Sequence, residues 1–381
     1  MVWERRLLLD AETQVSDSAT RRISLPRRGA LSGFELRTRI TNGATAGEEH
    51  IVDAIDRVEV VADGSHVLFS LEGVELLRWA WYGLKRFPPQ TWNEGVSAVQ
   101  ELVLPVLFGR FLADPDFWLD LAQYRDVELR IQYSPTIAAT SFATGTTQFH
   151  IPYWVDDSGS PPGGRLGFLR TTQVKAFTSA AAGEEVTELS RLYRYMDMMV
   201  YAREAAIADG VDVTEVELRV DDKRYVPYTG LWDDIQAENE HMLGVDPTVK
   251  MMALRANAAT IDLLTGRVLE GKVAARFTYI AATDFPMFTI GSAAGDRITL
   301  AGQLVEGSGT WAAVALDTTR RTLDVEARGL GIGSAVVIPF ALNGKPELAL
   351  DAPSMARLQL ALTQGGAGAA VKVSTRELVP A

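Results

Sequence analysis

The sequence contains the same series of segments twice, and this duplication constrains the fold more than any other feature. The first copy has an apolar strand at residues 58–61, an acidic turn at 63–64 and a short amphipathic segment from Gly73. The same order returns about 160 residues later, with a strand at 216–220, a turn at 221–222 and a similar segment after Gly230. Repetition on this scale defines architecture, so we expect two related units.

Three further pairs of segments extend the duplication to six elements in one order. They are a strand at 34–40 and at 193–200, an aliphatic run around Pro105 and Pro339, and a Leu-Asp pair with a following strand at 119–133 and at 350–362. The offset grows from 158 residues (58 to 216) to 234 residues (105 to 339). The second copy therefore carries an insertion between Gly244 and Gly333. Coincidence is the alternative, since short alternating strands recur in any β-protein, but six elements in order favour duplication.

Alternation of apolar and polar residues dominates the chain, and Gly and Pro interrupt it often. This pattern is typical of short strands that bury one face. Many such strands with turns between them favour sandwiches or barrels. We therefore predict an all-β protein of two tandem sandwiches, with one short helix in a loop of each. Helices are expected at 73–84 and 231–243, with weaker signals at 91–101 and 247–257.

The predicted domain organisation has four parts. Residues 1–30 form an N-terminal arm, 31–155 the first sandwich, 156–164 a linker rich in Ser, Pro and Gly, and 165–381 the second sandwich with the insertion at about 245–330. The arm carries three Arg pairs among polar residues, and such termini are often poorly ordered. It is either a frayed end or an assembly arm that reaches a neighbour, and we expect its removal to leave the fold intact.

Composition excludes several classes of function. The chain has 381 residues and a net charge of −12, which argues against a broad nucleic-acid surface. It has no cysteine, so disulfides, thiolate zinc sites and cysteine nucleophiles are excluded. No apolar run approaches the roughly 20 residues that span a bilayer.

The residues that could carry chemistry do not converge. The four histidines are not spaced as a helical metal motif, and the sequence Glu48-Glu49-His50 suits a solvated loop better than a metal site. Residues 156–159 lack the closing Glu of a calcium loop. The triplet at 307–309 is expected to be a hairpin turn and not a nucleophile elbow. The glycine-rich run 329–333 precedes a strand and not a helix, which argues against a phosphate site.

Paired carboxylates and aromatic residues keep a glycan-related function open. Asp114, Asp116 and Asp120 are close in sequence, as glycoside hydrolysis requires two nearby carboxylates. However, the pair Leu119-Asp120 recurs as Leu350-Asp351, which favours a structural turn. The aromatic residues near the first helix could form a sugar platform or pack the helix onto its sandwich or a subunit; they are Trp79, Trp81, Tyr82, Phe87 and Trp92. We predict no catalytic, cofactor-binding or metal-ligating residue.

The chain resembles the double jelly-roll major capsid proteins of tailless icosahedral viruses, the lineage that includes the adenovirus hexon. The resemblance covers about residues 34–373. It is carried by the strand, turn and helix at 55–84, by the run from 102 through Pro105 to 133, and by the matching set from 337 through Pro339 to 365. It implies two eight-stranded jelly-roll sandwiches with short helices in their loops.

The resemblance also implies a structural function in the virion and no enzymatic activity or cofactor. Three chains would form a pseudo-hexagonal homotrimer within an icosahedral shell. The implied partners are other copies of the chain, neighbouring capsomers, minor capsid and vertex proteins, and an internal viral membrane near the N-terminal arm, without sequence-specific nucleic-acid binding. The alternatives are a β-sandwich carbohydrate-binding protein or glycan-active enzyme, and a virion spike component.

Overall fold

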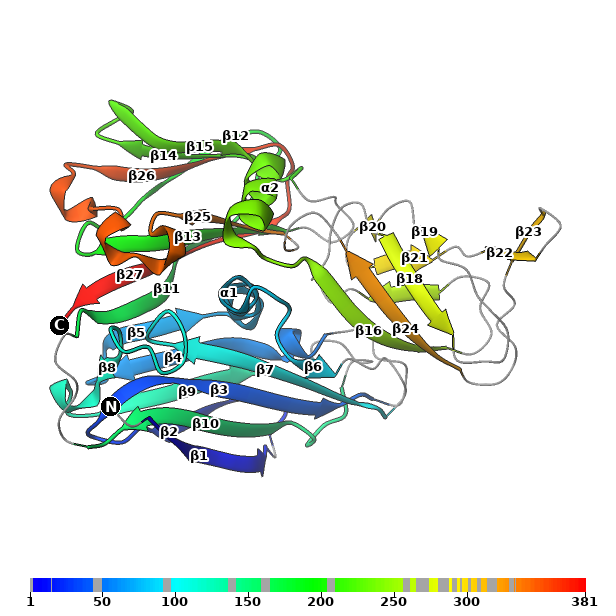
Figure 1. Cartoon of the computed structure of the whole chain (residues 1–381), viewed down its shortest axis with the longest axis horizontal. Coiled ribbons are helices and arrows are strands. Elements are labelled where there is room, and N and C mark those ends of the chain that lie inside the picture. The colour runs from blue at the N-terminus through cyan, green and yellow to red at the C-terminus, as the bar shows by residue number, and fades with distance from the viewer. Residues whose placement is uncertain are drawn as a thin grey trace.

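Figure 1 shows the computed structural model of the chain, with two β-sandwiches stacked on each other and a smaller group of strands beside them. The structure describes residues 3–14, 16–43, 50–91, 97–135, 142–158, 165–203, 210–255, 332 and 334–381. In the range 261–328 it describes only the strands named below.

The first sandwich consists of two facing antiparallel sheets. The order of one is β1 (Glu4–Thr13), β10 (Gln148–Asp156), β3 (Ala30–Thr41), β7 (Val99–Leu107) and β6 (Gln90–Thr91), and β8 (Leu119–Asp120) also pairs with β3. The order of the other is β2 (Ala19–Ser24), β9 (Val127–Tyr133), β4 (Ile55–Ala62) and β5 (His66–Leu71). Two 3-10 turns, η1 (Ile51–Ala54) and η2 (Leu121–Gln123), and the helix α1 (Gly73–Leu84) lie in its loops.

The second sandwich repeats this arrangement. One set of neighbouring strands is β11 (Gly167–Thr178), β27 (Ala370–Pro380), β13 (Arg194–Arg203) and β25 (Ala335–Pro339). The facing sheet is β12 (Gly183–Glu188), β26 (Leu358–Gln364), β14 (Val213–Val220) and β15 (Tyr225–Leu231). The helix α2 (Trp232–Leu243) follows β15, as α1 follows β5, and the 3-10 turns η3 (Leu342–Gly344), η4 (Pro346–Leu348) and η5 (Ala352–Ser354) lie between β25 and β26.

The order of the strands confirms the predicted duplication and the all-β fold of two jelly rolls. The sequence β1-β10-β3-β7 in the first sandwich corresponds to β11-β27-β13-β25 in the second, and β2-β9-β4-β5 corresponds to β12-β26-β14-β15. The expected helices at 73–84 and 231–243 are α1 and α2. The two prolines used to align the copies, Pro105 and Pro339, lie in β7 and β25, which are equivalent strands.

Each sandwich buries its own apolar core. Strand β9 shows the pattern that the alternation predicted, since Val127, Leu129, Ile131 and Tyr133 are buried and the residues between them are not. The second core contains Val216 and Leu218 of β14 together with Leu360 and Leu362 of β26. Burial of these alternating side chains fixes the register of each sheet, because a shift by one residue would turn the apolar set toward solvent.

The insertion in the second sandwich forms strands of its own between α2 and β25. One sheet has the order β16 (Thr248–Arg255), β24 (Arg321–Arg328), β18 (Ala274–Tyr279) and β19 (Phe288–Thr289); another contains β17 (Ile261–Leu264), β21 (Arg297–Leu300) and β20 (Ala293–Ala294). The strands β22 (Gln303–Glu306) and β23 (Thr310–Ala313) pair in antiparallel fashion. The hairpin turn expected at 307–309 lies outside the described residues. Figure 1 shows the insertion at one end of the molecule.

The expected N-terminal arm is wrong for most of its length. Strand β1 pairs with β10 from Glu4 to Thr13, and β2 pairs with β9 from Ala19 to Ser24, so both belong to the sheets of the first sandwich. The apolar alternation in these segments is weak because β1 buries only Leu9 and β2 has no fully buried residue. The expected linker begins inside β10, whose last residue is Asp156, and residues 159–164 lie outside the described part of the chain.

The two weaker helix predictions are also wrong. The range 91–101 contains the end of β6 and the start of β7, and the range 247–257 contains β16. Strand β16 pairs with β24 over eight residues, Thr248 to Arg255. Its Lys, Met, Ala and Leu residues favour helices in isolation, but the ladder of cross-strand hydrogen bonds overrides that preference.

Candidate functional site

The junction between the two sandwiches is the candidate functional site, because its contacts hold the two halves of the chain together. Helix α1 lies in this junction (Figure 1). Its residues are buried from Gly73 through Tyr82, on every side of the helix and not along a single stripe. A helix that is apolar nearly all round must be enclosed by protein. The second sandwich supplies the cover that the first sandwich lacks.

The ends of α1 are defined by local chemistry. Glu72 and Glu75 form a capping box, in which each side chain accepts a hydrogen bond from the backbone of the other residue. The helix ends at Lys85, which adopts the left-handed conformation with φ of 63°. Gly73 is required at the first turn, because a Cβ there would lie 2.4 Å from the carbonyl oxygen of Ile55. The helix is thereby held tightly against its own sandwich.

Three aromatic side chains of α1 form hydrogen bonds to distant parts of the chain. Trp79 Nε1 donates to Ser374 Oγ at 2.9 Å, and Trp81 Nε1 donates to the carbonyl oxygen of Asp246 at 2.7 Å. The Tyr82 hydroxyl lies 2.9 Å from Asn239 Oδ1 on α2. Buried aromatic residues contribute large apolar areas, and their polar atoms need partners. These contacts fix the position of α1 against β27 and α2.

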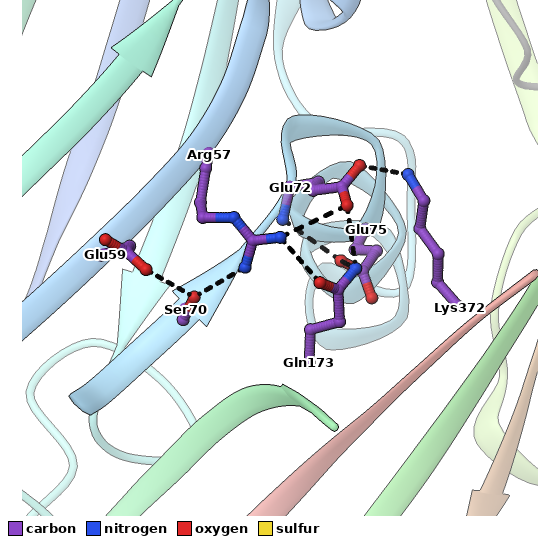
Figure 2. A network of polar contacts seen from close by, with 7 residues as sticks. All are labelled: Arg57, Glu59, Ser70, Glu72, Glu75, Gln173 and Lys372. Atoms are coloured by element: carbon purple, nitrogen blue, oxygen red, sulfur yellow. Dashed lines mark hydrogen bonds and ion pairs between the residues drawn. The ribbon is translucent and has the colours of Figure 1, made fainter. Parts of the chain in front are cut away.

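A polar network connects the start of α1 to the second sandwich (Figure 2). Glu72 forms an ion pair with Lys372 of β27. Gln173 of β11 donates from Nε2 to Glu72 Oε1 at 3.0 Å and to Glu75 Oε2 at 2.9 Å. Arg57 of β4 donates to Gln173 Oε1 at 2.7 Å. Residues from β4, α1, β11 and β27 therefore form one set of hydrogen bonds.

Arg57 extends this network into the first sandwich. Its Nη1 donates to Ser70 Oγ at 3.0 Å, and the Ser70 hydroxyl donates to Glu59 Oε1 at 3.1 Å. Figure 2 shows Arg57 between Ser70 on one side and Glu72 with Gln173 on the other. The ion pairs of this network are half-buried and add little net stability, so the network contributes mainly to the specific geometry of the junction.

The two glutamates at the start of α1, Glu72 and Glu75, differ in their protonation. Burial alone would raise the pKa of Glu72, but hydrogen bonds from Lys372 and Gln173 and the charges of Lys372 and Arg57 outweigh it and hold the pKa below its ordinary value. Burial raises the pKa of Glu75 to about 7. Its Oε1 has no hydrogen-bond partner among the described residues. At neutral pH the capping pair therefore consists of one ionised carboxylate, Glu72, and one that is partly protonated, Glu75.

The sheets of the two sandwiches are joined directly by a short parallel contact. Thr171 and Thr172 of β11 pair with Phe69 and Ser70 of β5. The result is an eight-stranded sheet that passes from the first sandwich into the second. Because backbone hydrogen bonds define this contact, the orientation of the two sandwiches is set by secondary structure as well as by side chains.

A groove of about 430 Å³ opens beside the junction. Its lining includes Trp79 and Ala80 of α1 and Val103 and Pro105 of β7. The charged residues of the lining are Glu35, Arg86, Arg110 and Arg376. The lining is mainly apolar, as is common for sites that bind small molecules or side chains.

A second charged cluster holds the loop after β7. Asp114 is fully buried, and its carboxylate accepts from Arg110 Nε at 2.8 Å, from Arg110 Nη2 at 2.8 Å and from the backbone N–H of Asp116 at 3.0 Å. Burial alone would raise the pKa of Asp114, but these hydrogen bonds and the guanidinium charge lower it. Asp116 also pairs with Arg110. Both carboxylates are therefore engaged in forming the turn and not free as a catalytic pair.

The other candidate residues of the sequence also have structural contacts. Asp120 Oδ1 accepts from the backbone of Ala122 at 3.0 Å, which confirms the predicted turn, whereas the side chain of its counterpart Asp351 caps no turn. His50 is buried; its Nδ1 accepts from Val52 N at 3.2 Å and its Nε2 lies 2.8 Å from Gln90 Oε1. Burial lowers the pKa of His50.

No described group of three or more His, Asp or Glu side chains has an arrangement that could hold a metal ion. Glu48 and Glu49, the neighbours of His50 in the expected loop, lie outside the described residues, as does Trp92. The interpretation of the remaining aromatic cluster as an open sugar platform is wrong for Trp79, Trp81 and Tyr82. Their exposed fractions are 8%, 0% and 5%, because the second sandwich covers them.

Sequence reasoning missed the polar network of the junction. The spacing of Glu72 and Glu75 before an apolar helix is a capping signal and could have been used. Nothing in the sequence indicates that Gln173 and Lys372, which are about 100 and 300 residues away, meet these carboxylates. Such pairings depend on the tertiary arrangement.

No protein-family model matches the sequence, and no curated protein sequence matches it. Solved structures do match over nearly the whole chain. The STIV MCP, from Sulfolobus Turreted Icosahedral Virus, is 12% identical with a TM-score of 0.60, covering 100% of this chain and 98% of that one. The PBCV-1 virus capsid is 9% identical with a TM-score of 0.58, covering 99% and 93%. The major capsid protein of bacteriophage PM2 is 13% identical with a TM-score of 0.51, covering 99% and 98%.

These similarities establish the fold. The chain has the double jelly-roll architecture found in these viral capsid structures, as the sequence resemblance implied. The identities of 9–13% explain why the duplication and the layout of strands carried the resemblance, whereas individual side chains did not.

Proposed function

We propose that this chain is the major capsid protein of an icosahedral virion and that three copies form a pseudo-hexagonal capsomer. The observation that carries the proposal is the repeated strand order, with one helix after the fifth strand of each sandwich. Two equivalent sandwiches in one chain allow a threefold ring to present six similar units. The neighbours in structure, which are named as capsid proteins, support the same conclusion.

The many contacts at the junction support a structural role. A tile in a shell must keep the angle between its two sandwiches, and here backbone pairing, buried aromatic residues and an ionic network act on one helix. The acidic balance of the chain, −12, suits a soluble shell protein and gives no broad surface for nucleic acid. We propose neither enzymatic activity nor a cofactor.

Further partners follow from the same proposal. In a closed shell the capsomer would contact neighbouring capsomers, minor capsid proteins and vertex proteins. The presence of an internal viral membrane stays a prediction. An N-terminal arm no longer supports it, because β1 and β2 belong to the first sandwich. No helix in the described ranges is both long and apolar enough to cross a bilayer.

Size-exclusion chromatography with light scattering tests the proposal. We expect a species of about three times the chain mass of 41.6 kDa. Negative-stain electron microscopy should show hexagonal outlines with threefold symmetry. A protein that stays monomeric at high concentration would contradict the proposal. Images of the source particle would separate a shell protein from a spike component.

A carbohydrate-binding or glycan-active protein is the second hypothesis from the sequence, and the geometry does not favour it. The aromatic residues that motivated it are enclosed in the junction, and Asp114 and Asp116 are paired with Arg110. Calorimetry against a glycan panel would test it directly. Saturable binding that Trp81→Ala abolishes, with the fold intact, would reverse this conclusion.

A further inference from the structure

Two strands occupy the same place in the two sandwiches but differ in their neighbours. Strand β5 pairs with β4 and also, in parallel, with β11. Its counterpart β15 pairs only with β14 among the described strands. The partner strands show the same difference, because β11 pairs with both β27 and β5, whereas its counterpart β1 pairs only with β10 in the described part of the chain. Among the described strands, the outer edges of β15 and β1 are therefore unpaired, whereas the equivalent edges of β5 and β11 pair with each other.

The helices beside these edges differ in the same way. Helix α1 is buried on all sides, whereas α2 buries only Trp232, Ile235, Gln236 and Asn239. Large apolar side chains are exposed near this free face. Tyr225, Leu231 and Met242 are 60%, 57% and 50% exposed, and Leu7 on β1 is 43% exposed. Open strand edges and exposed apolar groups are features of protein interfaces.

We propose that β15 and α2 of one copy bind β1 of a second copy in the same way that β5 and α1 bind β11 within the chain. This inference rests on the proposed function, since it specifies the contact between neighbouring chains of the capsomer. Figure 1 shows β15 and β1 at opposite ends of the stacked sandwiches, as a head-to-tail contact requires. A second copy of the chain thus binds each unpaired edge, and the contact between copies has the same geometry as the contact between β5 and β11 within the chain.

The equivalent residues on the receiving strand follow from the hairpins. In the first sandwich, Val60 of β4 pairs with Phe69 of β5. In the second, Leu218 of β14 pairs with Tyr228 of β15. The offset of 158 residues between β4 and β14 makes Val60 and Leu218 equivalent. Tyr228 therefore occupies the position of Phe69, the residue that pairs with Thr171 in the intrachain contact.

The equivalent residues on the incoming strand follow from the sheets. His150 pairs with Arg37 and Tyr153 with Phe34, which places Pro152 opposite Glu35. Residues that pair in succession across neighbouring strands form a row. In the first sandwich one such row is Pro105, Glu35, Pro152 and Leu7. The row across the second is Pro339, Asp197, Arg376 and Thr171. Aligned through the two prolines, Leu7 occupies the position of Thr171, so Leu7 of one copy is expected beside Tyr228 of another.

Side-chain chemistry at a second pair of positions is also complementary. Trp79 and Glu238 are each the seventh residue of their twelve-residue helices. Ser374, the partner of Trp79, corresponds to His150 in the aligned rows. Within the chain, the Trp79 indole binds the Ser374 hydroxyl. In the interchain contact, the Glu238 carboxylate and the His150 imidazole would take their places, and these two groups can also form a hydrogen bond. His150 has its Nδ1 3.2 Å from Asp10 and keeps its Nε2 for such a contact.

Repetition of this contact builds the assembly. It joins two different surfaces, so it forms either a ring or an open filament. In a ring of three chains, β15 of each copy is covered by β1 of the next. The sheet β12-β26-β14-β15 then continues into β1-β10-β3-β7-β6 of the neighbour, as β5 continues into β11 within the chain.

Engineered cysteines test this arrangement, and the natural chain has none to interfere. A chain carrying Leu7→Cys and Tyr228→Cys should form interchain disulfides under mild oxidation and run as a covalent trimer without reductant. The matched control is Phe69→Cys with Thr171→Cys, which should link within one chain. A second control pairs Tyr228→Cys with Leu192→Cys, because Leu192 is 64% exposed and precedes β13, so it is not part of β1; this pair should not link. Neighbouring Cα atoms in paired strands suit disulfide geometry.

A second measurement tests the same contact without depending on the strand register assumed for the disulfides. Tyr225→Asp and Leu231→Asp should raise the concentration at which trimers dissociate about tenfold or more, with unchanged circular dichroism, and Leu192→Asp should not. Trimers that show neither interchain disulfides nor weakening by these changes would overturn the assignment of surfaces and leave the proposed function intact. Protein that is monomeric before any substitution would overturn both.

Discussion

The indole Nε1 of Trp79 donates a hydrogen bond of 2.9 Å to the hydroxyl of Ser374, although 295 residues separate the two along the chain. Trp79 is on α1 of the first sandwich and Ser374 is on β27 of the second. Both side chains are buried, with exposed fractions of 8% and 0%. Because the last strand of the chain completes the environment of a helix formed by its first quarter, the two sandwiches are expected to unfold together.

Removal of the Trp79 side chain should destabilise the whole protein. Trp79→Ala leaves a large cavity at the junction and should lower the free energy of unfolding by about 3–5 kcal/mol. Chemical denaturation followed by tryptophan fluorescence and circular dichroism would measure it. Leu192→Ala, at a site that is 64% exposed, is the control and should change stability by less than about 0.5 kcal/mol. Separate transitions for the two sandwiches in the natural protein would contradict the expected coupling.

The carboxyl group of Glu75 should make stability depend on pH. Its pKa is about 7 in the folded protein against 4.5 for a free glutamate, so the folded state binds more protons than the unfolded state between these values. Stability should therefore fall as pH rises from about 4.5 to about 7, by up to roughly 3 kcal/mol from this group. Above pH 7 this contribution stays constant.

Glu75→Gln should remove much of that dependence. The amide oxygen can still accept from Gln173 and from the backbone of Glu72, but no charge has to be buried. We expect the variant to be more stable than the natural protein at pH 8 and similar to it at pH 4.5. Denaturation midpoints across this range would measure the effect. Glu101→Gln, on an exposed side chain, is the control. If stability depended on pH equally steeply in the Glu75→Gln and Glu101→Gln variants, ionisation of Glu75 would cost little.

The sequence allowed prediction of the fold where each copy repeats the pattern of the other. Pro105 with Pro339, and Leu119-Asp120 with Leu350-Asp351, aligned equivalent segments that the structure places in equivalent strands or turns. The first two strands were not predicted, because the edge strand β1 alternates only weakly. Strand β16 was assigned to a helix because its composition favours one.

The candidate site was predicted only in part. Packing or an interface was one of two interpretations of the aromatic residues of α1, a sugar platform being the other, and their partners on β27 and α2 depend on how the two sandwiches meet. The same holds for Gln173 and Lys372, whose side chains look like ordinary surface groups in their own strands. A parallel contact such as β5 with β11 has no local signal, since it joins segments about 100 residues apart.

A charge on the inner face of β9 should prevent folding. Leu129 is fully buried between Val127 and Ile131 in the alternating pattern of this strand. Leu129→Asp would bury a carboxylate without a partner, which costs several kcal/mol or forces the group to be neutral. Loss of soluble protein, or of the β-sheet signal in circular dichroism, would be the readout. Gln132→Asp on the outer face should be tolerated. Soluble trimers of the Leu129 variant would show that the core tolerates the charge.

Deletion of residues 1–28 should have the opposite effect from the one expected of a free arm. The deletion removes β1, which pairs with β10, and β2, which pairs with β9, so it exposes both edges of the first sandwich. Uncovered edges and the lost core contact of Leu9 and Leu25 should yield aggregated protein. A chain lacking only residues 1–3 is the matched control and should be soluble, because β1 begins at Glu4. Solubility and the cooperativity of thermal unfolding would distinguish the two. A stable, cooperative product of the larger deletion would mean that β1 and β2 contribute little to the sandwich.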